Sequence, residues 1–208
     1  MSSNTLLSNV MLSSLTQIKA FLMPPAMRER TDFDAQLTGF GQGVLAMMEG
    51  YCNRRLARVV GDVVKGSANN TVFSVRRFPV ETVTAVTLQT DVATLITDTV
   101  KRIDQDAGLI HFRAVPGQQD DTVIIEYTGG YWFDTSEAQD GEMPEDATAL
   151  PADLLAAFNL QMKAVCEAQD LFGLQAASGD GKGKPSTSMD LDLIPAVRAI
   201  LNTYRRFA

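Results

Sequence analysis

The residues that could do chemistry in this 208-residue sequence are few and stand far apart. Its single histidine, His111, lies in the middle of a stretch that predicts a strand, and no second histidine or nucleophile motif accompanies it. A catalytic histidine depends on such partners to orient it and to exchange the proton. We therefore expect His111 to be an ordinary strand residue, and an enzyme centred on it is the least favoured function.

The two cysteines, Cys52 and Cys166, fall in stretches that predict helices. Their spacing matches no metal-binding or redox motif, and free cysteine commonly behaves as a small buried hydrophobe. We expect both thiols to be buried and reduced, in a protein made inside a cell.

The run Gly179–Lys184 alternates glycine with charged residues, Asp180, Lys182 and Lys184, and invites comparison with a phosphate-binding loop. The comparison fails on spacing. Ser178 stands where the first glycine is needed, and Pro185 replaces the hydroxyl residue that holds magnesium. A flexible linker is the better interpretation of this run.

The acidic stretch from Asp134 to Asp146 contains Asp140-Gly141, a pair also found in calcium loops. The other ligand positions of such a loop are occupied by Ser136, Ala138 and Ala147. Because this ligand set is wrong for calcium, a solvated loop is favoured. The sequence thus predicts no catalytic residue, no metal site and no cofactor.

Charge and hydropathy narrow the function further. The formal net charge of −7 argues against nonspecific binding of nucleic acid by the whole surface. No apolar run approaches the roughly 20 residues that a membrane span requires, and the N-terminus lacks the basic start of a signal peptide. We expect no contact with a membrane.

The periodicity of apolar residues predicts an α+β fold. Helices are expected at 32–56, 151–172 and 192–207, and strands at 58–64, 71–75, 83–88, 93–103, 109–113 and 122–127. The short connections between strands indicate an antiparallel β-subdomain inserted into a helical scaffold. The first long helix contains Gly39, Gly41, Gly43 and Gly50, which predict a close neighbour helix or a neighbouring subunit.

Composition suggests four segments along the chain. They are an N-terminal extension at 1–31, a core of helix, β-subdomain and helix at 32–173, a flexible linker at 174–190 and a C-terminal docking helix at 191–208. The linker has almost no apolar residues, so we expect it to be mobile or to be ordered by a partner.

Tyr131, Trp132 and Phe133 form an aromatic cluster directly after Gly129-Gly130. Side chains at such a place either fold back over the core or are offered to a partner. Tryptophan and tyrosine are frequent anchors of protein interfaces. We therefore consider this cluster a candidate subunit or tail interface, with packing on the core as the open alternative.

The sequence resembles the head–tail connector, or adaptor, proteins of tailed bacteriophages. The resemblance runs from about Asp32 to Arg206 and is carried by an ordered set of segments: Glu49–Leu56, Phe78–Val83, Ile103–Ile110, Ile125–Tyr131, Leu150–Leu154 and Ile194–Arg205. The acidic stretch, the glycine-lysine linker and the long N-terminus depart from the family pattern.

The resemblance implies a structural virion protein without catalytic residues. Such a subunit forms a ring of twelve copies beneath the capsid portal protein after DNA packaging, assembled in the bacterial host cytoplasm. The ring joins the portal to the tail or stopper protein, and DNA passes through its lumen without sequence-specific binding.

We expect the C-terminal helix to make the portal contact, because a helix on a tether can reach a partner surface. The expected docking residues are Val197, Ile200, Leu201, Tyr204, Arg205, Arg206 and Phe207. The alternative is that this helix folds back onto its own core. At the level of the whole protein, the alternative function is a β-module that binds a small ligand or peptide in a pocket near Trp132.

Overall fold

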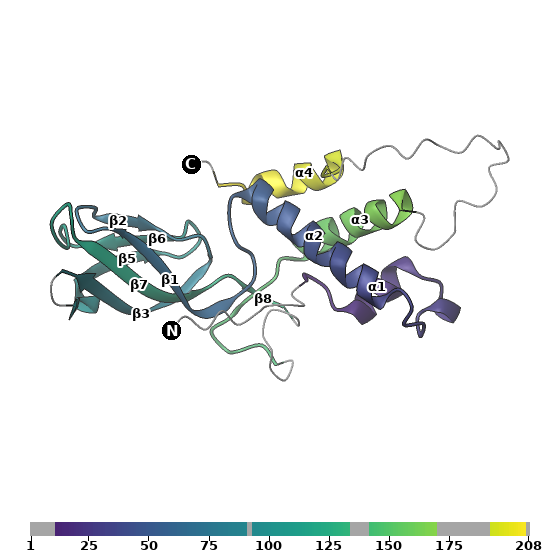
Figure 1. Ribbon diagram of the computed structural model, residues 1–208, viewed down its shortest axis with the longest axis horizontal. Coiled ribbons are helices and arrows are strands. Elements are labelled where there is room, and N and C mark those ends of the chain that lie inside the picture. The colour runs from purple at the N-terminus through teal and green to yellow at the C-terminus, as the bar shows by residue number, and fades with distance from the viewer. Residues whose placement is uncertain (1–10, 91–92, 134–141, 170–191, 207–208) are drawn as a thin grey trace. The chain divides into compact units, whose positions relative to one another are not determined.

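The computed structural model describes residues 11–90, 93–133, 142–169 and 192–206. By its contacts the chain divides into two units, one made of Met1–Cys52 with Pro151–Ala208 and the other of Asn53–Leu150 (Figure 1). The first is helical and the second is built of strands. This confirms the predicted α+β class. None of the described helices is long and apolar enough to cross a membrane.

The helical unit contains four α-helices and two short 3-10 helices among its described residues. They are α1 (Leu15–Leu22), η1 (Pro25–Met27), α2 (Asp34–Cys52), α3 (Ala152–Ala168), α4 (Pro195–Leu201) and η3 (Asn202–Tyr204). Helix α1 begins with a capping box, in which Ser14 accepts from the Gln17 backbone nitrogen and the Gln17 side chain accepts from the Ser14 nitrogen. It ends at Leu22, just before Pro24, because proline lacks the backbone N–H that would continue the helix.

Helix α2 ends at Cys52, earlier than the predicted end at residues 55–56. The reason is local. Asn53 adopts a left-handed conformation with φ of 52°, a common way to end a helix. Three residues past the helix end, the Arg55 nitrogen donates 2.8 Å to the Arg76 carbonyl, so the chain already follows the strands of the β unit there.

The core of the helical unit lies between α1, α2, α3 and α4, which contact one another. Its fully buried side chains include Ile18, Leu37, Met48, Leu154, Phe158, Met162, Val197 and Leu201. Met11 and Leu12, ahead of α1, are also buried. The part of the expected N-terminal extension that the structure describes therefore contributes to the core.

The β unit contains nine strands among its described residues. They are β1 (Val59–Ser67), β2 (Val72–Ser74), β3 (Val80–Gln89), β4 (Ala93–Leu95), β5 (Val100–Asp104), β6 (Leu109–Phe112), β7 (Thr122–Gly129), β8 (Tyr131–Trp132) and β9 (Thr148–Ala149). They form an antiparallel sheet of order β1-β7-β3-β4, a second of order β2-β6-β5 and a parallel pair β8-β9.

The two larger sheets share one hydrophobic core. Val86, Ile125 and Tyr127 come from the first sheet, and Phe73, Ile110 and Phe112 come from the second. Phe73 and Phe112 meet edge to face with ring centres 5.1 Å apart. The β unit is therefore a small sandwich with its own core.

The predicted strand at 93–103 is broken in the structure into β4, a 3-10 turn η2 (Thr97–Thr99) and β5. Threonine hydroxyl groups cause the break, because they bond to the backbone instead of leaving it to pair. The Val86 nitrogen donates 2.9 Å to Thr97 Oγ1, and Thr99 Oγ1 donates 2.6 Å to the Ile96 carbonyl.

Candidate functional site

The apolar face of the C-terminal segment is packed into the helical unit. Val197 and Leu201 are completely buried, and α4 contacts both α2 and α3. These two expected portal-docking residues therefore belong to the core of the chain in this conformation. The physical reason is that an apolar stripe finds a matching surface on α2 and α3, which removes it from water.

Polar contacts fix the C-terminal segment at several points along its length. The Gln161 side chain of α3 donates 3.2 Å to the Asp192 carbonyl and accepts 3.0 Å from the Ile194 nitrogen. Near its end, the Arg206 nitrogen donates 3.0 Å to the Cys52 carbonyl at the end of α2. The segment is thus bound at both ends to helices of its own unit.

The remaining docking candidates differ in exposure. Arg205 is exposed, whereas Ile200, Tyr204 and Arg206 are half-buried. The Arg205 guanidinium group lies 5.2 Å from the centre of the Tyr51 ring. Phe207 lies outside the described residues. Portal docking by this segment stays a prediction, now limited to the residues that are not buried.

The aromatic cluster is folded back on the β unit at two of its three residues. Tyr131 and Phe133 are buried, and Trp132 is half-buried. The Arg54 guanidinium group lies between two rings, 3.6 Å from the centre of Phe78 and 5.1 Å from that of Tyr131. Of the three residues, Trp132 is the one that can still meet a partner.

Tyr131 also joins the two places where the chain enters and leaves the β unit. Its nitrogen donates 2.7 Å to the Leu56 carbonyl, and its carbonyl accepts 2.9 Å from the Arg58 nitrogen. Tyr131 forms a β-bridge with Ala57 on one side and pairs with Thr148 of β9 on the other. Ala57, Tyr131 and Thr148 therefore lie side by side on three neighbouring segments, in adjacent rows. The two connections to the helical unit are therefore held together within the β unit.

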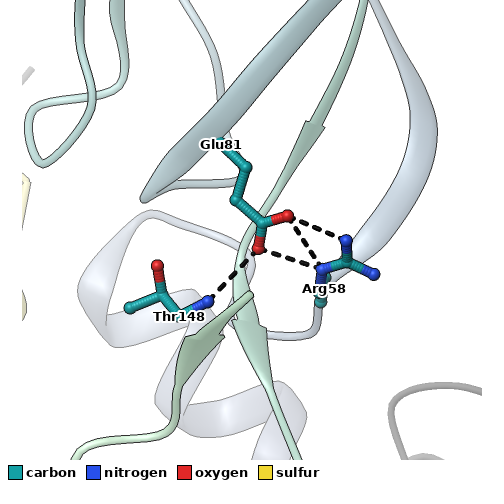
Figure 2. A network of polar contacts seen from close by, with 3 residues as sticks. All are labelled: Arg58, Glu81 and Thr148. Carbon is teal, nitrogen blue, oxygen red and sulfur yellow. Dashed lines mark hydrogen bonds and ion pairs between the residues drawn. The ribbon is translucent and has the colours of Figure 1, made fainter. Parts of the chain in front are cut away.

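A buried ion pair reinforces this junction. Figure 2 shows the Glu81 carboxylate between the Arg58 guanidinium group and the Thr148 backbone nitrogen. Arg58 Nε donates 2.9 Å to Oε1 and Arg58 Nη2 donates 2.8 Å to Oε2, with the side chains 8% and 3% exposed. Such a fork fixes geometry as well as neutralising both charges.

A second polar network joins Asp62 of β1 and Tyr127 of β7 to Arg77, which lies between β2 and β3. The Arg77 Nε atom is 2.9 Å from Asp62 Oδ2, and the Tyr127 hydroxyl donates 3.0 Å to the same oxygen. Burial of Tyr127, together with the negative charge of Asp62, raises the pKa of this hydroxyl above its ordinary value. The raised pKa agrees with a hydroxyl that keeps its proton and donates it in a hydrogen bond to Asp62.

No sequence motif predicted these buried charges. Arg54, Arg58 and Glu81 are separated along the chain, and their burial depends on which strands become neighbours. The one hint was the position of Arg58 and Glu81 at the starts of two apolar strand runs, where a charge is unusual.

The residues with chemical potential are not brought together. His111 lies on β6 with Nε2 3.4 Å from Arg102 Nη2. Cys52 and Cys166 are free thiols, both buried. No group of three histidine, cysteine or carboxylate residues suited to a metal ion occurs among the described residues. The absence of a catalytic role and of a cofactor stays a prediction.

One exposed face of helix α2 consists of small residues. Ala35, Gly39, Gly43, Ala46 and Gly50 recur on one side of the helix and are all exposed. A Cβ atom added at Gly39, Gly43 or Gly50 would meet nothing within 4 Å. Only Gly41, of these α2 glycines, is packed closely by its own unit, against Met11 and Phe158. The predicted close neighbour is therefore found for one glycine of the four.

Comparisons with known proteins give a match in solved structures alone. No family model matches the sequence, and no curated protein matches it either. A chain in the neck of an empty gene transfer agent particle, computed with C6 symmetry, is similar with a TM-score of 0.60 and 17% identity, covering 100% of this chain and 94% of that one. A chain in the virion of the native gene transfer agent particle has a TM-score of 0.59 and 17% identity, covering 95% and 91%.

At this level of identity the likeness shows a shared fold. It extends over nearly the full length of both chains, so it includes the helical unit and the inserted β unit. The chains therefore share the fold of both units.

Proposed function

We propose that this chain is a structural subunit of a virion neck, a head–tail connector that forms a ring under the capsid portal and joins it to the tail or stopper. The single observation that carries the proposal is the full-length likeness in fold to a chain of a particle neck. The ordered sequence segments that resemble phage connectors support it independently.

The chemistry of the described residues agrees with a role exercised through surfaces. The buried charges pair within the β unit, and the single histidine lies beside an arginine on an ordinary strand. We therefore propose no catalytic activity. Ring symmetry is part of the proposal, and twelve copies would be compatible with sixfold symmetry because twelve is a multiple of six.

The test is to mix the purified chain with the portal protein of the same particle and to image the mixture by negative stain. A connector gives a second ring on the portal and a matching shift in sedimentation. If the chain neither forms a ring nor binds the portal at any concentration, the proposed function is wrong. A monomer that instead melts at a higher temperature with a peptide or small ligand supports the binding-module alternative.

A further inference from the structure

The outer face of the β2-β6-β5 sheet is basic in a protein that is acidic as a whole. Strand alternation places Ile110 and Phe112 of β6 in the core, so His111 faces outward, and Arg113, the residue after the strand, is exposed. Arg102 pairs with His111 across the strands and contacts it on the same face, which also carries the Asp104 carboxylate, opposite Leu109. We call Arg102, His111 and Arg113 the basic face. Against a net charge of −7, such a cluster marks a specific surface.

The basic face has an apolar neighbour. Val72 pairs with His111 on the side opposite Arg102, and it is 43% exposed. Among the described residues, no ion pair with a carboxylate involves Arg102 or Arg113. The face therefore offers two arginines that form no ion pair with the nearby Asp104, beside one exposed valine side chain.

A surface of opposite character lies on another part of the same unit. The segment Glu142–Asp146, just before β9, has three exposed carboxylates, on Glu142, Glu145 and Asp146. Met143 between them is 46% exposed. In the described part of the chain these carboxylates also have no ion pair. We call this segment the acidic segment.

The two surfaces carry opposite charge. Each also has an exposed apolar side chain, Val72 beside the basic face and Met143 in the acidic segment. We propose that the basic face binds the acidic segment of a second copy of this chain, with Met143 packed beside Val72. Because the contact joins two different patches, each copy can engage one neighbour on each side. Such a head-to-tail interface closes into a ring when the rotation between copies is a whole fraction of a turn. This inference rests on the proposed ring and names the surfaces that build it.

Charge reversal tests the contact in the full-length chain. One variant carries Arg102→Glu with Arg113→Glu, and the other carries Glu142→Arg with Glu145→Arg. Each alone places like charges together, so self-association, or ring formation on the portal, should weaken by at least about tenfold. An equimolar mixture should restore assembly, because each variant keeps one native surface and the reversed surfaces also match each other.

Two controls keep the result specific. Lys65→Glu with Asp120→Arg reverses two exposed charges elsewhere on the β unit and should leave assembly unchanged. All variants should melt at the wild-type temperature, because the changed side chains are on the surface. Sedimentation velocity and negative stain measure the assembly.

Each other outcome overturns the inference. If the wild type forms rings and both variants do too, the contact is wrong while the proposed function stands. Loss in each variant without rescue in the mixture means that the two surfaces do not meet. If Arg102→Glu with Arg113→Glu loses only binding to duplex DNA, the basic face serves nucleic acid instead. A wild type that makes no ring alone or on the portal refutes the proposed function first.

Discussion

The Tyr204 hydroxyl group donates a hydrogen bond of 2.7 Å to the Asp153 carboxylate, which joins the C-terminal segment to the first turn of α3. These residues are far apart in the sequence, so the bond exists only because the segment folds back on its own unit. It accompanies the complete burial of Val197 and Leu201. The C-terminal segment is thus part of the fold, whatever else it does.

Replacing Leu201 by alanine should destabilise the helical unit by about 2–5 kcal/mol, because it leaves a cavity in a packed core. Thermal unfolding followed by far-ultraviolet circular dichroism measures the loss. Ala199→Ser, at an exposed position of the same helix, is the matched control and should change stability little. An unchanged melting temperature for Leu201→Ala, with portal binding lost, would favour docking by this face instead.

Tyr131→Ala should destabilise the β unit, because it removes the ring beside the buried Arg54 guanidinium group. Tyr131→Phe keeps that ring and should lose much less. Trp132→Ala should alter stability least and weaken assembly or tail binding, since this side chain is half-buried. Urea unfolding measures the loss of stability in each of the three variants. The prediction is contradicted if Trp132→Ala is the least stable of them.

Arg58→Ala should destabilise the β unit by about 3–5 kcal/mol, because it leaves the Glu81 carboxylate buried without its partner. The double replacement Arg58→Met with Glu81→Leu removes both charges and should cost considerably less. Trp132 is the single tryptophan and lies in the β unit, so its fluorescence reports this unfolding selectively. Equal losses in the two variants would show that the pair is not the stabilising element.

Gly39→Ala and Gly43→Ala should each stabilise the isolated chain by up to about 1 kcal/mol, because alanine favours helix and meets no neighbour there. Gly41→Ala is the matched contrast. Its Cβ would lie 3.0 Å from Met11 Cγ and 3.5 Å from Phe158 Cζ, and it would crowd Met11 Sδ, so we expect a loss of stability. Gains at all three positions in urea unfolding would mean that Met11 yields readily.

Burial, together with the negative charge of Glu167, raises the pKa of the Cys166 thiol from 9.0 to about 11. The unfolded thiol loses its proton at lower pH than the folded one, so this group's contribution is present below pH 9 and decreases as the pH rises toward about 11. Urea unfolding across this range should show a steeper alkaline loss for the wild type than for Cys166→Ala. Equal slopes would show that the thiol does not contribute.

Most strands were predictable because alternation and turn residues act locally. The strands β1, β2, β3, β6 and β7 overlap the expected ranges. The break at Thr97–Thr99 was missed because threonine suits a strand by propensity, and only the partner of its hydroxyl decides otherwise. A linear pattern does not contain that partner.

The apolar stripe of the C-terminal helix did not show which surface would bury it. Val197 and Leu201 show the same spacing whether they face the chain's own helices or another protein, since burial is equally favourable in both places. The buried pair of Arg58 and Glu81 was hidden for a related reason, because it depends on strands that meet only after folding. The sequence showed which apolar residues would be buried, but it did not show which surface would bury them.

Because Ala57 and Thr148 both pair with Tyr131, the β unit begins and ends at neighbouring positions. A segment that begins and ends at one point of its own fold can be exchanged as a cassette, because any replacement with equally close ends leaves the path of the flanking chain unaltered. Recombination at two sites near codons 53 and 150 would replace the whole sandwich in one step. The helical unit and the β unit can then diversify at independent rates.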